Sequence, residues 1–180
     1  MLLTYLCFAG FLSMLGLAAF KDLRERRIPN RLTAGLALLY PVYVLLSPVP
    51  VAWPAALGVA TAVFLVGLGL FARDLIGGGD VKLIAAVSLW AGPEHFVWFM
   101  LITTLTGGAL SLISLFYQRW AGVIEAHLAA LGLAAIGGLG GSVSAAPRSD
   151  MSAAPPPATL PYAVAIAAGG VAVVIQLLKL

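Results

Sequence analysis

Residues 2–31 read LLTYLCFAGFLSMLGLAAF followed by KDLRERRIPNR, an unbroken apolar run that ends in the most basic stretch of the chain. The apolar part holds 19 residues. As a helix, at about 1.5 Å per residue, it crosses a hydrocarbon core of about 30 Å. By the positive-inside rule the basic part, residues 21–31, is cytoplasmic, which places the amino terminus outside. The two segments predict an all-α integral membrane protein.

Composition supports this fold class. Apolar residues make up 62% of the 180 residues and charged residues only 9%, with a mean hydropathy of +1.05. A soluble domain carries about 25% charged residues, so this chain has too few to cover a water-facing surface. The net charge of +3 does not indicate nucleic-acid binding, because the basic residues flank apolar runs. We expect those in the basic loop to contact anionic lipid.

Five further apolar runs complete a predicted bundle of about six membrane helices with both chain ends outside. Pro41 is expected to kink the second helix, and an outer turn is expected at residues 92–94, Gly-Pro-Glu. The predicted topology places nine of the ten basic residues on or near the cytoplasmic side, as the positive-inside rule requires. The five runs are residues 32–46, 55–71, 81–90, 96–117 and 160–178.

Residues 121–146 are the segment whose placement the sequence leaves open. They are apolar but rich in Gly and Ala, and they include Glu125 and His127. A seventh span would reverse the last helix and put Lys179 inside, at little cost to the positive-inside rule. We favour a surface or re-entrant segment on the cytoplasmic side. A flexible linker is predicted at about residues 142–157. The chain as a whole, residues 1–180, is expected to form one membrane-embedded domain.

Asp80 has the most distinctive setting of the ionisable residues. It follows Gly77, Gly78 and Gly79 and precedes the short predicted helix 81–90. Glycine permits positive φ and lets another backbone, such as an extended peptide, approach closely. Capping of the helix amino end is the plainer role for Asp80. The helix, about 16 Å long, falls short of the bilayer core, so Asp80 is expected to lie below the cytoplasmic surface in a water-filled notch.

Asp22 stands at the inner end of the first predicted helix. Taken alone, it reads as a solvated carboxylate that neutralises Lys21, Arg26 or Arg27 at little energetic gain. The predicted topology, however, places Asp22 and Asp80 at the same membrane face. Two carboxylates that share a site cannot both ionise easily, so one holds a proton while the other activates water. That is the requirement for aspartyl-type peptide hydrolysis, which needs neither metal nor cofactor.

Other polar residues have weaker interpretations. Glu25 is placed to pair with neighbouring arginines, and Asp74 to pair with Arg73 or to contact a basic substrate segment. The single cysteine and the two isolated histidines lack the spacing of metal ligands, so no metal site is expected.

Three motifs together resemble those of the type IV prepilin peptidases, a family of GxGD aspartyl proteases. Residues 77–83, GGGDVKL, are similar to the GxGD segment, and residues 22–30, DLRERRIPN, to an aspartate motif that continues with Ile-Pro-Asn. Residues 160–169, LPYAVAIAAG, resemble the last-helix motif. The resemblance is closest to the short CpaA/TadV-like branch, which serves Flp-type pili of tight-adherence systems.

The resemblance implies a multi-pass protein of the bacterial inner membrane that removes the leader peptide of a prepilin on the cytoplasmic side. It carries the catalytic pair onto Asp22 and Asp80. Lys82, Pro29 and Asn30 match further motif positions. We expect Lys82 to be an internal charge partner and Pro29-Asn30 to start the second helix. Larger members carry a methyltransferase region with paired CxxC motifs; with one cysteine, this chain is not expected to methylate. The oligomeric state stays open.

Two other functions compete with this interpretation. A small carrier or channel would use Asp22, Asp80 and Lys82 as an ion path, but these residues fall at one predicted face and no charge lies deep in the other helices. Another GxGD intramembrane protease would act on different membrane substrates. The residues that follow Asp22 favour the prepilin peptidases by resemblance.

Overall fold

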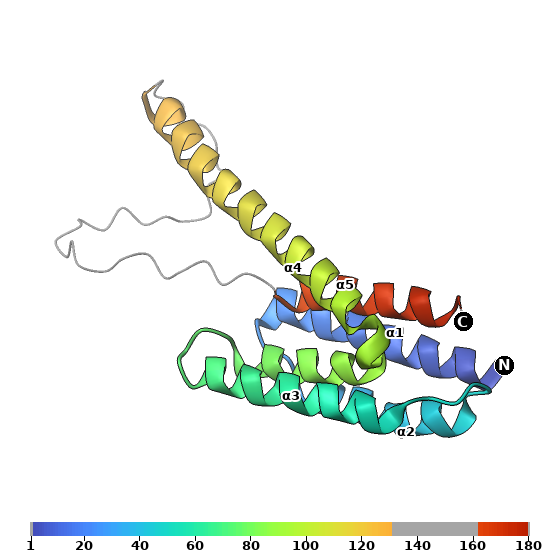
Figure 1. Ribbon diagram of the computed structural model, residues 1–180. Helices are drawn as coiled ribbons and strands as arrows, with labels where there is room; N and C mark the ends of the chain where they lie inside the picture. The colour runs from blue at the N-terminus through green and yellow to red at the C-terminus, as the bar shows by residue number, and fades with distance from the viewer. Residues whose placement is uncertain (1, 131–161, 180) are drawn as a thin grey trace. The chain divides into compact units, whose positions relative to one another are not determined.

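The computed structural model describes residues 2–130 and 162–179, and these ranges are helical apart from short connections. The predicted all-α class is confirmed for them (Figure 1). In chain order the helices are α1 (Leu2–Glu25), α2 (Asn30–Leu46), α3 (Trp53–Phe71), α4 (Gly78–Ala130) and α5 (Tyr162–Leu177).

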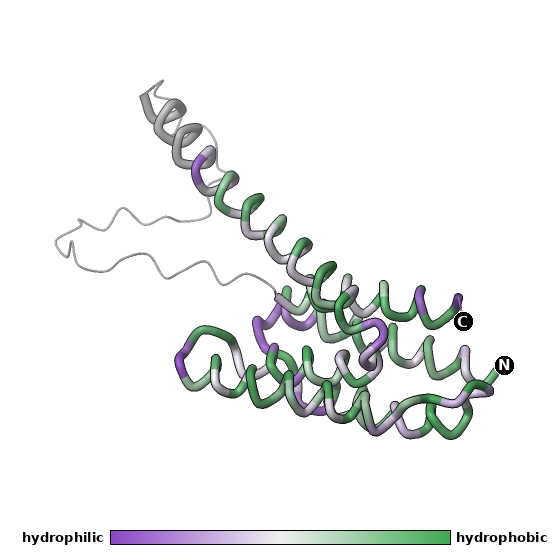
Figure 2. The backbone as a smooth tube through the Cα atoms, viewed as in Figure 1, coloured by the Kyte–Doolittle hydropathy of each residue, from purple (hydrophilic) through white to green (hydrophobic). Residues whose placement is uncertain are grey.

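Three of these helices are long and apolar enough to cross a membrane. They are α1, α3 and the Gly78–Tyr117 part of α4, while α2 and α5 are shorter apolar helices. Figure 2 shows hydrophobic residues along the helices and hydrophilic residues mainly near helix ends. The described helices are therefore compatible with a membrane protein. The six spans, the outer amino terminus and the depth of Asp80 stay predictions.

A break at Gly92 divides α4 into a first limb, residues 78–91, and a second limb, residues 93–130. Gly92 has a φ of 58° and a ψ of −174°, a left-handed conformation that glycine adopts without a Cβ clash. Pro93 follows and cannot donate a backbone hydrogen bond. The turn predicted at residues 92–94 is therefore confirmed, and the two limbs contain the predicted helices 81–90 and 96–117.

The second limb of α4 does not stop at Arg119, where the predicted helix ends. It continues to Ala130, because residues 118–130 hold no proline and are rich in residues of high helix propensity. The first part of the segment 121–146 is thus a continuation of α4. The rest of that segment and the predicted linker at 142–157 lie outside the described residues.

The chain divides into two compact units, residues 1–109 with 161–180 and residues 110–160; the single domain predicted for residues 1–180 stays a prediction. The first unit contains the residues that the sequence motifs single out. Within it α1 packs against both α2 and α5. The side chains that α1 buries lie on one face, as helical spacing requires: Cys7, Phe8, Phe11, Leu15 and Ala18.

Helix α3 contributes little to this core. It buries only Ala56 and Ala60, whereas large side chains such as Leu57, Leu65 and Val66 are exposed. Exposed apolar surface of this extent is typical of a helix that faces lipid or a protein partner.

Candidate active site

Asp22 lies within α1 rather than after it. The helix continues beyond the apolar run to Glu25, and the Asp22 carbonyl accepts a hydrogen bond from the Arg26 N–H at 2.9 Å. Arg26 has a φ of 50°, the left-handed conformation that commonly follows the end of a helix. Asp22 is half-buried, so its side chain is partly withdrawn from water.

The Asp22 carboxyl group has a backbone partner rather than a basic one. Its Oδ2 accepts a hydrogen bond from the Ala163 N–H, in the first turn of α5, at 3.1 Å. Lys21 pairs with Glu25 at 3.4 Å, so Glu25 does not use the arginines. Within the described ranges no ion pair joins Asp22 to a basic side chain. The interpretation of Asp22 as a solvated, neutralising carboxylate is wrong.

Asp80 lies inside the first turn of α4 rather than at its cap. The helix begins at Gly78, and the Gly77 carbonyl accepts the Val81 N–H at 3.1 Å. Gly77 therefore occupies the cap position, and the N-cap role considered for Asp80 is wrong. Like Asp22, Asp80 is half-buried.

The two aspartates, far apart in sequence, come together in the first unit. Burial disfavours a charge on the Asp80 carboxyl group, and Asp22 lies close enough for its charge to add to this effect. Partial burial strengthens this repulsion, because less water screens it. Such a pair favours a state in which one member holds a proton while the other is charged.

The glycines before and within the start of α4 do not adopt the positive φ that glycine permits. Among the described glycines only Gly92 has a positive φ. At Gly77 the missing side chain leaves room beside a carboxyl, because a Cβ there would stand 3.0 Å from Asp80 Oδ2. The approach of a substrate backbone to this point stays a prediction.

The other two glycines of the run allow close packing. A Cβ on Gly78 would stand 3.1 Å from Phe71 Cε2, at the end of α3. A Cβ on Gly79 would stand 3.2 Å from Ile28 Cβ, in the connection before α2. Both distances are shorter than ordinary contacts, so the glycines let the start of α4 lie against these neighbours.

Lys82 joins the start of α4 to the start of α2. Its Nζ donates to Asn30 Oδ1 at 3.0 Å. Asn30 is the first residue of α2, and Pro29 before it is extended, with a φ of −64° and a ψ of 130°. The prediction that Pro29-Asn30 starts the second helix is confirmed. Lys82 is exposed and bonds a neutral amide, so its expected role as an internal charge partner is wrong.

Asp74 has a structural role that its sequence setting did not indicate. It is exposed, with a φ of 55°, and the adjacent Leu75 N–H donates to the Leu70 carbonyl at 3.1 Å. This pattern closes the end of α3. The predicted ion pair with Arg73 does not form in the described part of the chain.

Comparison with known proteins gives the family of this chain. A family model described as the type IV leader peptidase family matches residues 9–112. The chain belongs to this family. A prepilin leader peptidase/N-methyltransferase of Xanthomonas campestris pv. campestris is 34% identical over 101 residues, which are 53% of this chain and 35% of the relative. No solved structure matches the chain significantly.

The family match includes Asp22 and Asp80 but not α5. The residues around Asp22 gave no sign of the contact with α5, because Ala163 and Asp22 are 141 residues apart in sequence. A local signal was present. Pro161 precedes α5 and marks a helix start, and helix amino ends stabilise nearby carboxylates.

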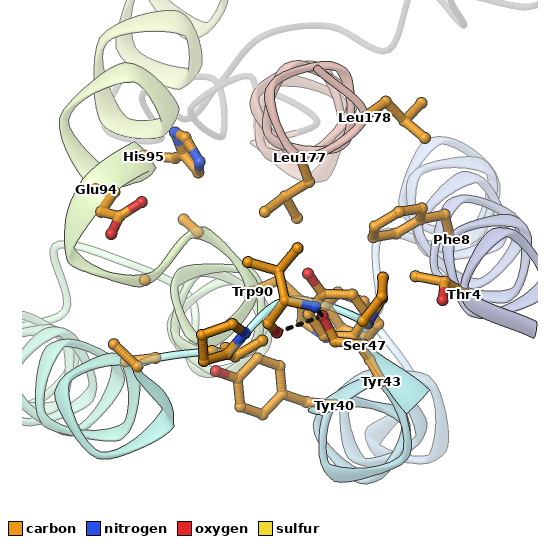
Figure 3. A pocket seen from close by; sticks show the side chains of 18 of the residues that line it. Thr4, Phe8, Tyr40, Tyr43, Ser47, Trp90, Glu94, His95, Leu177 and Leu178 are labelled. Carbon is orange, nitrogen blue, oxygen red and sulfur yellow. Dashed lines mark hydrogen bonds between the residues drawn. The ribbon is translucent and has the colours of Figure 1, made fainter. Parts of the chain in front are cut away.

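The larger cavity of this leader peptidase family member lies away from the aspartates. It measures about 530 Å³ and is lined by the start of α1, the end of α2 and the end of α5 (Figure 3), whereas Asp22 and Ala163 lie at the opposite ends of α1 and α5. A second hollow of about 450 Å³ is lined by Asn30, Lys82 and mostly small side chains of α2, α3 and α4.

Proposed function

We propose that this chain is a membrane aspartyl endopeptidase that removes the leader peptide of Flp-type prepilins at the cytoplasmic face of the bacterial inner membrane. The observation that carries the proposal is that the half-buried Asp22 and Asp80 lie close enough for the charge of one to act on the other, within the stretch that matches the type IV leader peptidase family. The motif resemblance to the short CpaA/TadV-like branch supports the Flp-type substrate. Methylation is not part of the proposed activity.

The proposed reaction needs only the pair and one water molecule. The charged carboxylate takes a proton from water, whose oxygen attacks the scissile carbonyl carbon, and the protonated carboxyl gives its proton to the carbonyl oxygen. The neutral tetrahedral intermediate then loses a hydroxyl proton to the group that had protonated the carbonyl oxygen. The group that had taken the proton from water protonates the nitrogen as the C–N bond breaks. Both carboxyls regain their starting states, and the products are a carboxylic acid and an amine.

Family membership supports this function over that of a carrier or channel. A leader peptidase requires paired carboxyls at one place, whereas an ion path requires polar groups along the membrane normal. The Lys82 side chain, which the carrier would use, is exposed and bonded to Asn30. The substrate that is cleaved distinguishes the proposed function from that of another GxGD protease.

The test is leader removal from purified prepilin by the full chain in lipid vesicles, followed as a mobility shift on gels and by mass spectrometry of the new amino terminus. We expect cleavage of an Flp-type prepilin, with slower cleavage of a prepilin from another pilus class. Activity should persist with a metal chelator. An uncut prepilin at every pH, with a correctly inserted enzyme, would overturn the proposal.

Topology is tested separately. We propose six spans with both chain ends outside, which places Asp22 and Asp80 at the cytoplasmic side. Single cysteines introduced at Arg24 and at Val49, in a background that lacks Cys7, should react with a membrane-impermeant reagent from opposite sides. Labelling of both sites from one side would contradict the predicted orientation of α1 and α2.

A further inference from the structure

We propose that the amino end of α5 decides how the aspartate pair shares its proton. The Ala163 N–H holds Asp22 in the charged state, so that Asp22 activates water and Asp80 carries the proton. This inference rests on the proposed function, because it assigns roles within the same hydrolytic pair. Ala163 is a positioning residue here, since it acts through its backbone on Asp22.

The hydrogen bond to Asp22 comes from a helix end that has donors to spare. Ala163 is the second residue of α5, and the first four N–H groups of a helix have no partner within it. Its N–H reaches Asp22 Oδ2 at 3.1 Å, in a place where Ala163 is fully buried. A backbone donor stabilises a carboxylate more than a neutral carboxyl. The aligned peptide dipoles of α5 act in the same direction.

Asp80 has no equivalent support. Among the hydrogen bonds of the described residues, none ends on the Asp80 carboxyl group. Gly77, at which a Cβ would stand 3.0 Å from Asp80 Oδ2, has no side chain to donate. Burial disfavours the charged form of Asp80, and the repulsion from Asp22 acts in the same direction. When one proton is shared by the pair, it is therefore more stable on Asp80.

In the described ranges no basic side chain, including Arg24 of α1, Arg26 and Arg27 of the adjoining loop and Arg31 of α2, forms an ion pair with Asp22. From α4 the facing group is Asp80, which opposes a second charge. On α1 itself, Lys21 and Glu25 pair with each other at 3.4 Å. At the start of α5 the ionisable residue is Tyr162, which is exposed. The α5 amide is thus the contact that distinguishes one aspartate from the other.

The assignment gives each proton a definite place in the reaction. Water loses its proton to Asp22, and Oδ1 is the expected acceptor because the amide occupies Oδ2. Asp80 gives its proton to the scissile carbonyl oxygen and recovers one from the tetrahedral intermediate. Asp22 then protonates the leaving nitrogen. The enzyme returns to charged Asp22 and protonated Asp80.

The decisive experiment removes the N–H without adding atoms. Replacing Ala163 by lactic acid in the full chain changes its N–H to an ester oxygen. The matched control is the same amide-to-ester change at Val164, whose N–H is not donated to Asp22 in the described contacts. The rate of leader removal in vesicles is measured against pH for both proteins. Each profile should have an acid limb, where Asp22 gains a proton, and an alkaline limb, where Asp80 loses one.

We expect the ester at residue 163 to move the acid limb to higher pH by about one unit, because charged Asp22 loses a charge-assisted hydrogen bond. The alkaline limb and the control profile should not move. A shift of the alkaline limb instead would place the shared proton on Asp22 and overturn the assignment. An unchanged profile with a lower rate would also overturn it, since that is the result of a purely structural role.

A second pair of variants uses ordinary mutagenesis. Ala163→Pro also removes the N–H, and proline is tolerated in the first helical turn. Tyr162→Pro places the same ring one residue earlier and keeps the Ala163 N–H. Only Ala163→Pro should shift the acid limb; equal shifts in both variants would contradict the inference. Failure of the wild-type protein to cut prepilin at any pH would refute the proposed function. That result is distinct from a shift in one variant and from equal shifts in both variants.

Discussion

The end of the first unit that holds Asp22 and Asp80 differs from the end that holds Trp90 in how its polar groups are accommodated. Trp90 is buried, and its ring centroid lies 4.6 Å from that of Phe11 and 5.2 Å from that of Tyr43. Its Nε1 donates to the Leu36 carbonyl at 2.9 Å. The aromatic end is thus a cluster of buried rings around a satisfied donor, although the buried Tyr40 hydroxyl in the same cluster has no hydrogen-bond partner among the described residues.

The aspartate end has the opposite character. Asp22 and Asp80 are half-buried and repel each other, and in the described ranges neither pairs with a basic side chain. Such an arrangement costs stability. The comparison teaches that the first unit is stabilised at its aromatic end, and that the aspartate end is arranged for chemistry at some cost to the fold.

The largest expected effect concerns the aspartate end. Asp22→Asn and Asp80→Asn should each lower the rate of leader removal by about a thousand-fold or more, because each removes one proton-transfer group. Stability should not fall, since the mutual repulsion disappears. The measurements are cleavage in vesicles and thermal unfolding in detergent.

Two nearby acids serve as controls for this prediction. Glu25→Gln and Asp74→Asn also remove a carboxylate close in sequence to the pair or to its glycine loop, but neither group contacts the pair in the described structure. Both variants should cut at close to the wild-type rate. Full activity in Asp22→Asn or Asp80→Asn would refute the hydrolytic pair.

The next largest effect concerns the aromatic end. Trp90→Ala should lower the free energy of unfolding by about 3 kcal/mol or more, because it leaves a cavity among buried rings and frees the Leu36 carbonyl from its partner. The folded fraction should still cleave prepilin. Thermal unfolding in detergent, with activity normalised to folded protein, separates the two effects. If Trp90→Ala stays stable but loses catalysis, the aromatic end also contributes to catalysis, and the assignment of stability to one end and chemistry to the other is wrong.

Local sequence patterns were enough to predict much of the fold. Continuous apolar runs predicted the helices, and Gly92-Pro93 predicted the break in α4 because one residue tolerates a left-handed φ and the other lacks a donor. Pro29-Asn30 likewise predicted the start of α2. In each case the physical cause lies within a few residues of its effect.

The parts that sequence did not predict depend on contacts between distant segments. The extension of α1 to Glu25 is an exception, because it is favoured by the local Lys21–Glu25 pair one turn apart. The partner of Lys82 and the amide that binds Asp22 depend on how different helices pack together. The same holds for Gly78 and Gly79, which are required by Phe71 and Ile28. The pairing of Asp22 with Asp80 was predicted only through topology and resemblance.

A smaller effect sharpens the comparison at the contact between α1 and α5, which joins the two ends. A Cβ on Gly170 would overlap Leu15 Cδ2, whereas a Cβ on Gly16 meets nothing within 4 Å. Gly170→Ala should therefore lower the free energy of unfolding by about 1–3 kcal/mol. Gly16→Ala should raise it by about 0.5–1 kcal/mol, since alanine favours the helix. Equal effects in detergent unfolding would show that α5 does not pack on α1 as described.

The smallest expected effect concerns Lys82, which lies at the aspartate end without belonging to its chemistry. A double-mutant cycle with Lys82→Met and Asn30→Ala should give a coupling free energy below about 1 kcal/mol, because both residues are exposed to screening solvent. Cleavage by Lys82→Met should stay within a few-fold of the wild type. A coupling of several kcal/mol, or loss of cleavage restored by Lys82→Arg, would make Lys82 a charge partner of the pair. It would then extend the functional end of the molecule to the start of α2.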